Sequence, residues 1–139
     1  MNLQLNGKVV LVTGSTSGIG FGIAKVLSEE GSAVVVNGRT ADAIKLAVER
    51  IKGSYGVQGD VTNFQECEDI IADVIDKFGQ LDILVANVGS GSSARPGDET
   101  PYDWEQMLKL NLLAATNMVH AASCALKKTR GNIVVISSI

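Results

Sequence analysis

Cysteine is scarce in this 139-residue sequence, which has two, Cys67 and Cys124. Both fall in helical patterns, far apart and without a CxxC or CxxH neighbour, so neither a disulfide framework nor a metal site is expected. Two reduced, packed thiols are typical of a cytoplasmic protein, which is the location we expect.

Long apolar runs and an excess of positive charge are also missing. No hydrophobic stretch approaches the length of a membrane span, and residues 1–8 lack the regions of a signal peptide. The net charge of −3 argues against nucleic acid or an anionic membrane as the main partner. With 45% hydrophobic and 19% charged residues, the chain can form the core of one globular domain.

A glycine-rich stretch, TGSTSGIG at residues 13–20, is the most informative feature present. It follows the apolar run Val9–Val12 and opens onto a helical pattern over residues 21–27. Glycines allow a sharp turn and a close approach of backbone to phosphate, and a helix N-terminus offers unpaired N–H groups. The order strand, glycine turn, helix therefore predicts a site for a phosphate-bearing ligand, the alternative being a tight turn without a ligand.

Strand and helix patterns alternate along the rest of the chain. The predicted strands are residues 8–13, 32–37, 54–58, 81–86 and 132–137, and the predicted helices are 18–31, 40–53, 62–79 and 100–129. Thr40, a Thr62–Gln65 capping box and a Thr100–Asp103 capping box are expected to begin the last three helices. Strands buried on both faces and joined by helices predict a three-layer α/β fold, a Rossmann-like doubly wound parallel sheet of order 3-2-1-4-5.

Several motifs together resemble the short-chain dehydrogenase/reductase family. They are the turn at residues 13–20, Asp60-Val61, Asn87-Val88-Gly89, Asn111, and Ile136-Ser137-Ser138. Their order and spacing match the family over the whole chain, except that Val88 stands where the family usually has alanine. The resemblance implies an NAD(P)-binding Rossmann domain over residues 1–139, with a dinucleotide held by Gly14, Ser15, Ser17, Gly18, Ile19, Gly20, Arg39, Asp60, Val61, Asn87 and Gly89.

Two of these residues have a structural alternative. By the resemblance Asp60 contacts the adenine ring, but it can also serve only to begin the helix at Thr62. Asn87 lies at the carboxyl end of a strand, where ligands bind in open α/β sheets, and can also form an Asx turn. For Asn87 the two roles are compatible.

The end of the second predicted strand favours NADP(H) over NAD(H). A protein that prefers NAD commonly has an acidic residue there to bind the ribose 2′-hydroxyl. This chain has Asn37-Gly38-Arg39-Thr40 instead, and a guanidinium can pair with a 2′-phosphate. Ser15 is expected to add a hydroxyl donor. The alternative for Arg39 is an ordinary solvated loop cation.

The resemblance also implies catalytic roles for Asn111 and Ser138. Asn111 stands among the leucines of residues 108–113, so an apolar environment is expected in which the amide needs partners. By the resemblance it would hold a water in a proton relay, although an amide there can also satisfy a local irregularity of the backbone. Ser138 would hydrogen-bond the substrate carbonyl. The family's proton donor, a tyrosine in Tyr-x-x-x-Lys, is absent, and neither Tyr55 nor Tyr102 precedes a lysine at that spacing.

We therefore expect the amino-terminal part of an oxidoreductase that transfers hydride between NADP(H) and a ketone or secondary alcohol. A 3-oxoacyl compound or a sugar or polyol would suit as substrate. The domain is expected to be incomplete after the fifth strand, inactive alone, and part of a homo-oligomer when complete. The apolar strand at Ile133–Ile136 would then be an exposed sheet edge. The alternative is a non-catalytic dinucleotide-binding or regulatory protein.

Overall fold

The computed structural model describes residues 3–91 and 94–137 and contains one five-stranded sheet. All the strand pairs are parallel, and the order is β3-β2-β1-β4-β5, which confirms the predicted Rossmann-like topology. The elements are β1 Val9–Val12, α1 Gly18–Glu29, β2 Ala33–Gly38, α2 Ala41–Arg50, β3 Tyr55–Gln58, α3 Phe64–Phe78, β4 Ile83–Ala86, α4 Pro101–Leu108, the π-helical segment η1 Lys109–Leu113, α5 Ala114–Thr129, and β5 Asn132–Val135.

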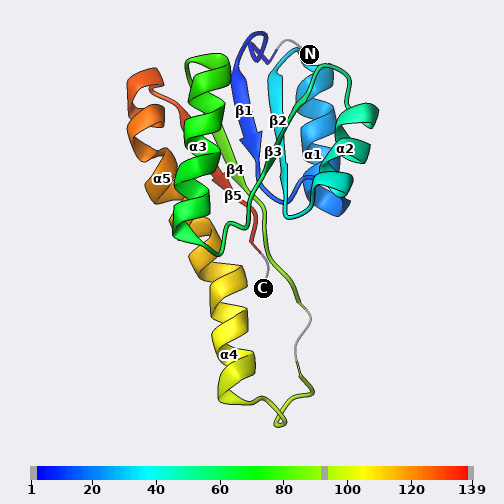
Figure 1. Cartoon of the computed structure of the whole chain (residues 1–139), viewed down its shortest axis with the longest axis vertical. Coiled ribbons are helices and arrows are strands. Elements are labelled where there is room, and N and C mark those ends of the chain that lie inside the picture. Colours follow the sequence, from blue (N-terminus) through cyan, green and yellow to red (C-terminus); the bar gives the residue numbers. More distant parts are fainter. Residues whose placement is uncertain (1–2, 92–93, 138–139) are drawn as a thin grey trace.

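Helices cover both faces of the sheet, so the fold has three layers (Figure 1). Alternate residues of β1 point to opposite faces, as the period of a strand requires. Val9 and Leu11 pack with α3 and α5 in one core cluster. Val10 and Val12 pack with α1 and α2 in the other. All of β1 is buried because both of its faces are covered, which explains its continuous apolar run.

The helices begin and end close to the predicted residues, but only one of the three predicted caps forms its capping hydrogen bonds. Thr100 and Asp103 form the predicted capping box, with Pro101 as the first residue of α4. The prediction for α3 is wrong: Asn63, not Thr62, is the cap, and its side chain accepts hydrogen bonds from the backbone N–H groups of the residues two and three positions on. Thr62 instead donates to Asp60. Thr40 occupies the cap position of α2 without a capping hydrogen bond from its side chain.

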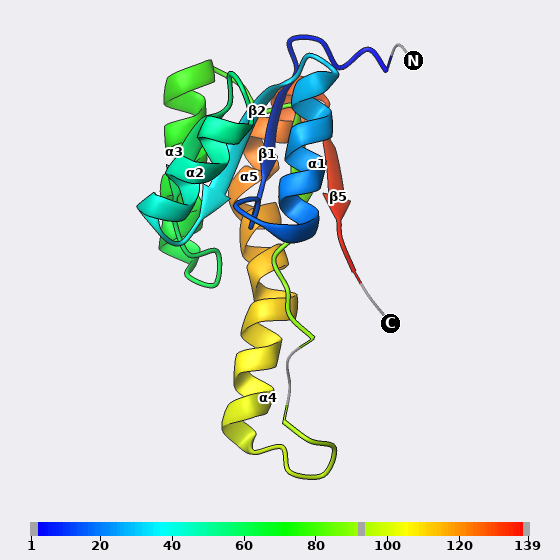
Figure 2. The same cartoon turned by 90° about the vertical axis from the view of Figure 1, so that its right-hand side faces the viewer.

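The long helix predicted over residues 100–129 is continuous but not uniform. It comprises α4, η1 and α5, and its middle segment has π-helical hydrogen bonding. Such a segment inside an α-helix commonly marks a functional site. No residue of α4 is buried, and α4 extends beyond the end of the sheet (Figures 1 and 2).

Strand β5 lies at the edge of the sheet and is exposed along its whole length. Ile133, Val134 and Val135 keep 44%, 46% and 52% of their surface accessible, as the sequence predicts for an apolar edge. Of the two cysteines, Cys67 is buried as expected, whereas Cys124 is exposed.

Within residues 3–91 and 94–137, the structure contains no helix that is both long and apolar enough to cross a membrane.

Candidate functional site

A pocket of about 610 Å³ lies at the carboxyl ends of β1, β2, β3 and β4. Its wall is completed by four residues of α4 and η1, namely Gln106, Met107, Lys109 and Leu110. The sequence-predicted residues that line it are Gly14, Ser17, Gly18, Ile19, Arg39, Asp60, Val61, Asn87 and Gly89. Four separate segments of the sequence therefore meet where ligands bind in open α/β sheets.

The glycine-rich turn has a backbone that favours glycine. Gly14 and Gly18 have φ angles of +59° and +57°, a region that other residues seldom adopt. A Cβ on Gly20 would collide with the side chain of Asn87 and with the carbonyl of Gly14. Gly20 is thus needed for close packing of α1 on the turn, and it does not itself line the pocket.

The N-terminus of α1 is open toward the pocket. Ser17 occupies the cap position, but its side chain makes no capping hydrogen bond. The first-turn N–H groups of a helix have no partner within the helix, and together they give this end a partial positive charge. Ser17, Gly18 and Ile19 line the pocket at this point, so an anionic group placed there meets free donors.

Ser15 does not occupy the position expected from the sequence. It is fully buried and absent from the pocket lining. Its Oγ donates to the Val12 carbonyl at 2.6 Å and accepts from the Asn37 N–H at 3.0 Å. Because both bonds are internal, the hydroxyl stabilises the turn. Thr16, which the sequence analysis missed, lines the pocket instead.

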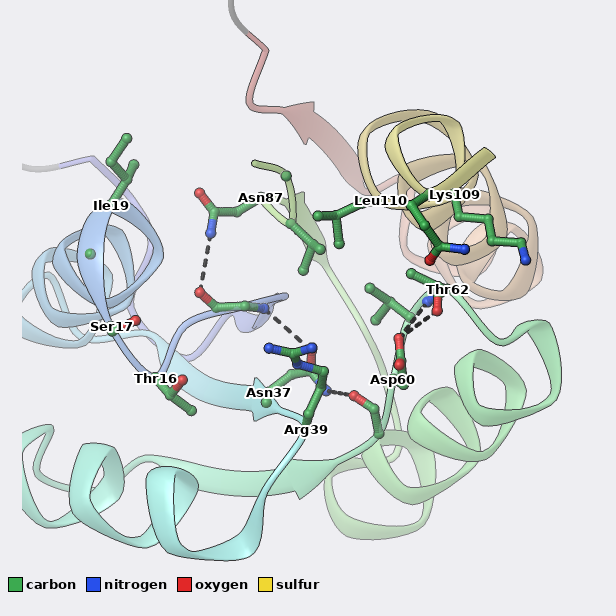
Figure 3. Close-up of a pocket in the computed structure, with 18 of the residues that line it drawn as sticks. Thr16, Ser17, Ile19, Asn37, Arg39, Asp60, Thr62, Asn87, Lys109 and Leu110 are labelled. Atoms are coloured by element: carbon green, nitrogen blue, oxygen red, sulfur yellow. Dashed lines mark hydrogen bonds between the residues drawn. The ribbon is translucent and has the colours of Figure 1, made fainter. Parts of the chain in front are cut away.

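Asn87 joins the end of β4 to the glycine-rich turn. Its N–H donates to Thr13 Oγ1 at 3.0 Å. Its side-chain Nδ2 donates to the carbonyls of Thr13 and Gly14, each at 3.2 Å. The bond to Gly14 is the dashed line at Asn87 in Figure 3. Asn87 thus stabilises the glycine-rich turn by donating to it, rather than through an Asx turn of its own, and it also lines the pocket.

Asp60 both begins the turn before α3 and lines the pocket. Its Oδ1 accepts from the N–H and the Oγ1 of Thr62, at 2.9 and 2.7 Å, so it begins the turn that leads into α3. Its own N–H donates to Glu66 Oε2 at 2.7 Å. These bonds hold the Asp60 carboxylate at the pocket wall, beside the buried Val61.

Arg39 is exposed at the end of β2, and its side chain turns toward the interior of the pocket (Figure 3). No carboxylate of the described residues pairs with its guanidinium. Its backbone carbonyl accepts from Gln58 Nε2 at 2.9 Å, which ties this segment to the end of β3. The neighbouring Gly38 has no room for a side chain, because a Cβ would collide with Thr16.

Asn111 lies in η1 and is exposed, which corrects the expectation of an apolar environment. The leucines around it, such as Leu108 and Leu112, are themselves about half exposed. Its Oδ1 accepts from the Ser90 N–H at 2.9 Å, and its Nδ2 donates to the Ser90 carbonyl at 3.1 Å. Asn111 thus links the helix to the loop after β4, next to Gly89, and is not part of the pocket lining.

Ser138 lies outside the described residues, so its predicted role rests on the sequence alone. Within the described ranges, no group of histidine, cysteine, aspartate or glutamate is arranged to hold a metal ion.

Sequence reasoning missed the wall of the pocket formed by Met107 and Leu110, and the buried Asn37 beneath the turn. Helical periodicity gives no indication that residues of α4 and η1 face the ends of the strands. For Asn37 an indication was present, because a polar residue ends an otherwise apolar strand and a buried amide needs partners.

Known proteins resemble the chain in both sequence and structure. It is 38% identical over 142 residues to a D-beta-hydroxybutyrate dehydrogenase of Cupriavidus necator, with 97% of this chain and 54% of that protein covered. It is 34% identical over 134 residues to an L-fucose dehydrogenase of Oryctolagus cuniculus, with 96% and 47% covered. The chain therefore spans about half the length of the curated relatives it matches.

A solved structure of L-sorbose reductase from Gluconobacter frateurii, complexed with NADPH and L-sorbose, superposes with a TM-score of 0.93. The two sequences are 29% identical, and the match covers all of this chain and 55% of that one. The family model of the short chain dehydrogenases matches residues 8–139. The chain therefore belongs to the short chain dehydrogenase family of oxidoreductases.

Proposed function

We propose that this chain forms the cofactor-binding part of an NADP(H)-dependent enzyme that interconverts a ketone and a secondary alcohol. The observation that supports it most strongly is the end of β2, where Arg39 faces the pocket without a carboxylate partner among the described residues. A 2′-phosphate would pair with this guanidinium, whereas a carboxylate at that place would repel it.

Different parts of the pocket would bind different parts of a dinucleotide. The pyrophosphate would bind at the open N-terminus of α1, where Ser17, Gly18 and Ile19 line the pocket. The adenine ring suits the wall formed by Asp60 and Val61. Thr16 offers a hydroxyl near Arg39 for the 2′-phosphate, in place of the buried Ser15.

The chemistry requires hydride at carbon and a proton at oxygen. A nicotinamide cofactor, when bound, would supply or accept the hydride. On this chain, Ser138 would hydrogen-bond the substrate carbonyl and stabilise the charge that develops on its oxygen. Asn111, whose side chain bonds the backbone of Ser90 in this structure, would hold a water for proton transfer. The substrate would be a small carbonyl or alcohol compound, such as a 3-oxoacyl or sugar substrate, and the working protein a cytoplasmic homo-oligomer.

The alternative function is a dinucleotide-binding or regulatory protein without catalysis. The pocket lining accounts for dinucleotide binding whether or not a reaction follows, so the pocket alone fits both proposals. The coding sequence beyond Ile139 separates the two proposals. A Tyr-x-x-x-Lys shortly beyond it favours the enzyme, and a stop codon favours the binder.

The experiment that tests the enzyme is an assay of the product of the complete gene. We expect it to oxidise NADPH when given ketones from a panel of 3-oxoacyl and keto-sugar compounds, and to use NADH less well. If no ketone or alcohol supports turnover although NADPH binds, the binding protein is the better assignment. If neither dinucleotide binds, both proposals fail.

A further inference from the structure

Asn37 is a buried polar residue at the end of β2, with 1% of its surface exposed. Its side-chain amide bonds two segments that come from different parts of the chain. Oδ1 accepts from the Gly14 N–H at 3.3 Å. Nδ2 donates to the carbonyls of Val57 and Gly59, each at 3.2 Å.

The backbone of Asn37 strengthens the link to the glycine-rich turn. Its N–H donates to Ser15 Oγ at 3.0 Å, and its carbonyl accepts from the Ser15 N–H at 2.9 Å. Gly14 is thereby fixed on two sides, because Asn87 bonds its carbonyl while Asn37 bonds its N–H. A side chain without both a donor and an acceptor cannot make these contacts.

The two linked segments form opposite parts of the pocket. Gly14 begins the turn that leads to the open N-terminus of α1, and Gly59 directly precedes Asp60. We propose that Asn37 is a positioning residue for the dinucleotide, which holds the glycine-rich turn and the end of β3 at a fixed separation. The pyrophosphate can then bind at the turn while the adenosine binds at the end of β3. This inference rests on the proposed binding of NADP(H) at this pocket.

Asn37 and Arg39 have different effects on the cofactor under this proposal. The segments that Asn37 aligns would contact groups shared by NADPH and NADH, so its loss weakens both by the same factor. Arg39 would contact the 2′-phosphate alone, so its loss changes the ratio of the two affinities. Asn37 would therefore set the affinity for both dinucleotides, and Arg39 would set the preference between them.

The test compares Asn37→Ala and Asn37→Ser with the unmutated product of the complete gene. We expect the Kd values for NADPH and for NADH, measured by calorimetry, to rise together by about tenfold, because the buried hydrogen bonds of the Asn37 side chain are lost. Turnover at saturating cofactor should change far less than the KM for cofactor, since the reacting groups are untouched.

Asp82→Ala is the matched control for a loss of stability. Asp82 is also a buried polar residue, but its Oδ2 accepts from the Val9 N–H at 2.9 Å, at the opposite end of the sheet from the pocket. This variant should unfold more easily and keep both Kd values. If Asp82→Ala raises them as much as Asn37→Ala does at equal loss of stability, Asn37 has only a structural role and the inference is wrong.

Hydrogen exchange on the unmutated, cofactor-free protein tests the same claim without a variant, should neither substitution fold. The Gly14 amide is expected to exchange as slowly as the amides of β1. Exchange at the rate of an open loop overturns the inference. Unchanged Kd values in Asn37→Ala overturn it as well, provided that the unmutated protein binds NADPH. Failure of the unmutated protein to bind either dinucleotide overturns the proposed function.

Discussion

Two regions of this molecule are built in opposite ways. Around the glycine-rich turn, buried polar groups such as Ser15 and Asn37 are paired with partners from neighbouring strands. Along β5 and α4, apolar side chains remain exposed, including Val135 at 52% and Leu108 at 52%. The first region is fixed by buried side-chain hydrogen bonds, whereas β5 is held by its backbone pairing to β4 and keeps its apolar side chains exposed.

This difference separates the part of the site near the glycine-rich turn, whose residues hold one another in place, from the part beside β5. The dinucleotide half is held by short-range links between strand ends, such as Asn87 to Gly14 and Asp60 to Thr62. On the side of β5, where the hydride would be transferred, the hydrogen bonds that link β5 to β4 are those of backbone pairing. We therefore expect perturbations of the first region to act on cofactor affinity, and those of the second to act on association and local stability.

Gly20→Ala should have the largest effect. The added methyl group would collide with Asn87 and with the carbonyl of Gly14, so the turn and α1 must move apart. We expect a loss of more than about 100-fold in NADPH affinity and a decrease of about 2 kcal/mol in the free energy of unfolding. Calorimetric titration and urea unfolding measure the two quantities.

Gly22→Ala is the control for that substitution. Gly22 lies in the same helix, and a Cβ there meets nothing within 4 Å. This variant should be more stable by about 0.5–1 kcal/mol and bind NADPH as before. Equal losses of affinity in both variants would show that the effect comes from helix α1 in general and not from the packed turn.

Arg39→Ala should reduce the preference for NADPH over NADH by about tenfold, because a charge-assisted hydrogen bond to phosphate is worth about 1.5–3 kcal/mol. Lys45→Ala removes one positive charge from the exposed surface of α2 and leaves the pocket unchanged, so its preference should stay as it was. An unchanged preference in Arg39→Ala would identify Arg39 as a solvated loop cation.

The exposed edge should make residues 1–139 associate when they are produced alone. Val134 is 46% exposed on β5, and an apolar edge strand is a template for pairing with another chain. Analytical ultracentrifugation is expected to show self-association, and Val134→Lys is expected to reduce it. A monomeric, cooperatively unfolding preparation of the unmutated residues 1–139 would contradict this account of the edge.

The smallest effect is expected at the start of α4, a helix without buried residues. Hydrogen bonds from the Thr100 hydroxyl and N–H hold the pKa of Asp103 below its usual value. Since the folded pKa is lowered, this carboxylate stabilises the helix above its ordinary pKa, and the contribution is lost as pH falls through the lowered value. The protection factors of the α4 amides, which are corrected for the intrinsic pH dependence of exchange, should therefore fall in acid, and Asp103→Asn should remove that dependence.

Much of the fold could be predicted because periodicity and turn chemistry act locally. The apolar run of β1, the glycine-rich turn and the Thr100–Asp103 capping box each depend on neighbours in sequence, and each is confirmed. The prediction of Thr62 as the cap of α3 is wrong: Asn63 is the cap, because the Thr62 hydroxyl donates to Asp60 instead. Competition between adjacent polar residues is not visible in a spacing rule.

The site was less predictable, because it depends on which way side chains face. TGSTSGIG offers four hydroxyls, and the structure buries those of Thr13 and Ser15 and leaves Thr16 and Ser17 at the pocket. Asn111 was expected among buried leucines and is exposed, because α4 and η1 extend past the sheet. Long-range packing decides both cases.

The most direct test of the central claim is a calorimetric titration of the complete gene product with NADPH and, separately, with NADH. The account predicts one site per chain, with NADPH bound about tenfold or more tightly than NADH, because only NADPH offers a phosphate to Arg39. Equal affinities, or tighter binding of NADH, would contradict the assigned preference, and absence of binding by both would contradict the assignment of the pocket itself.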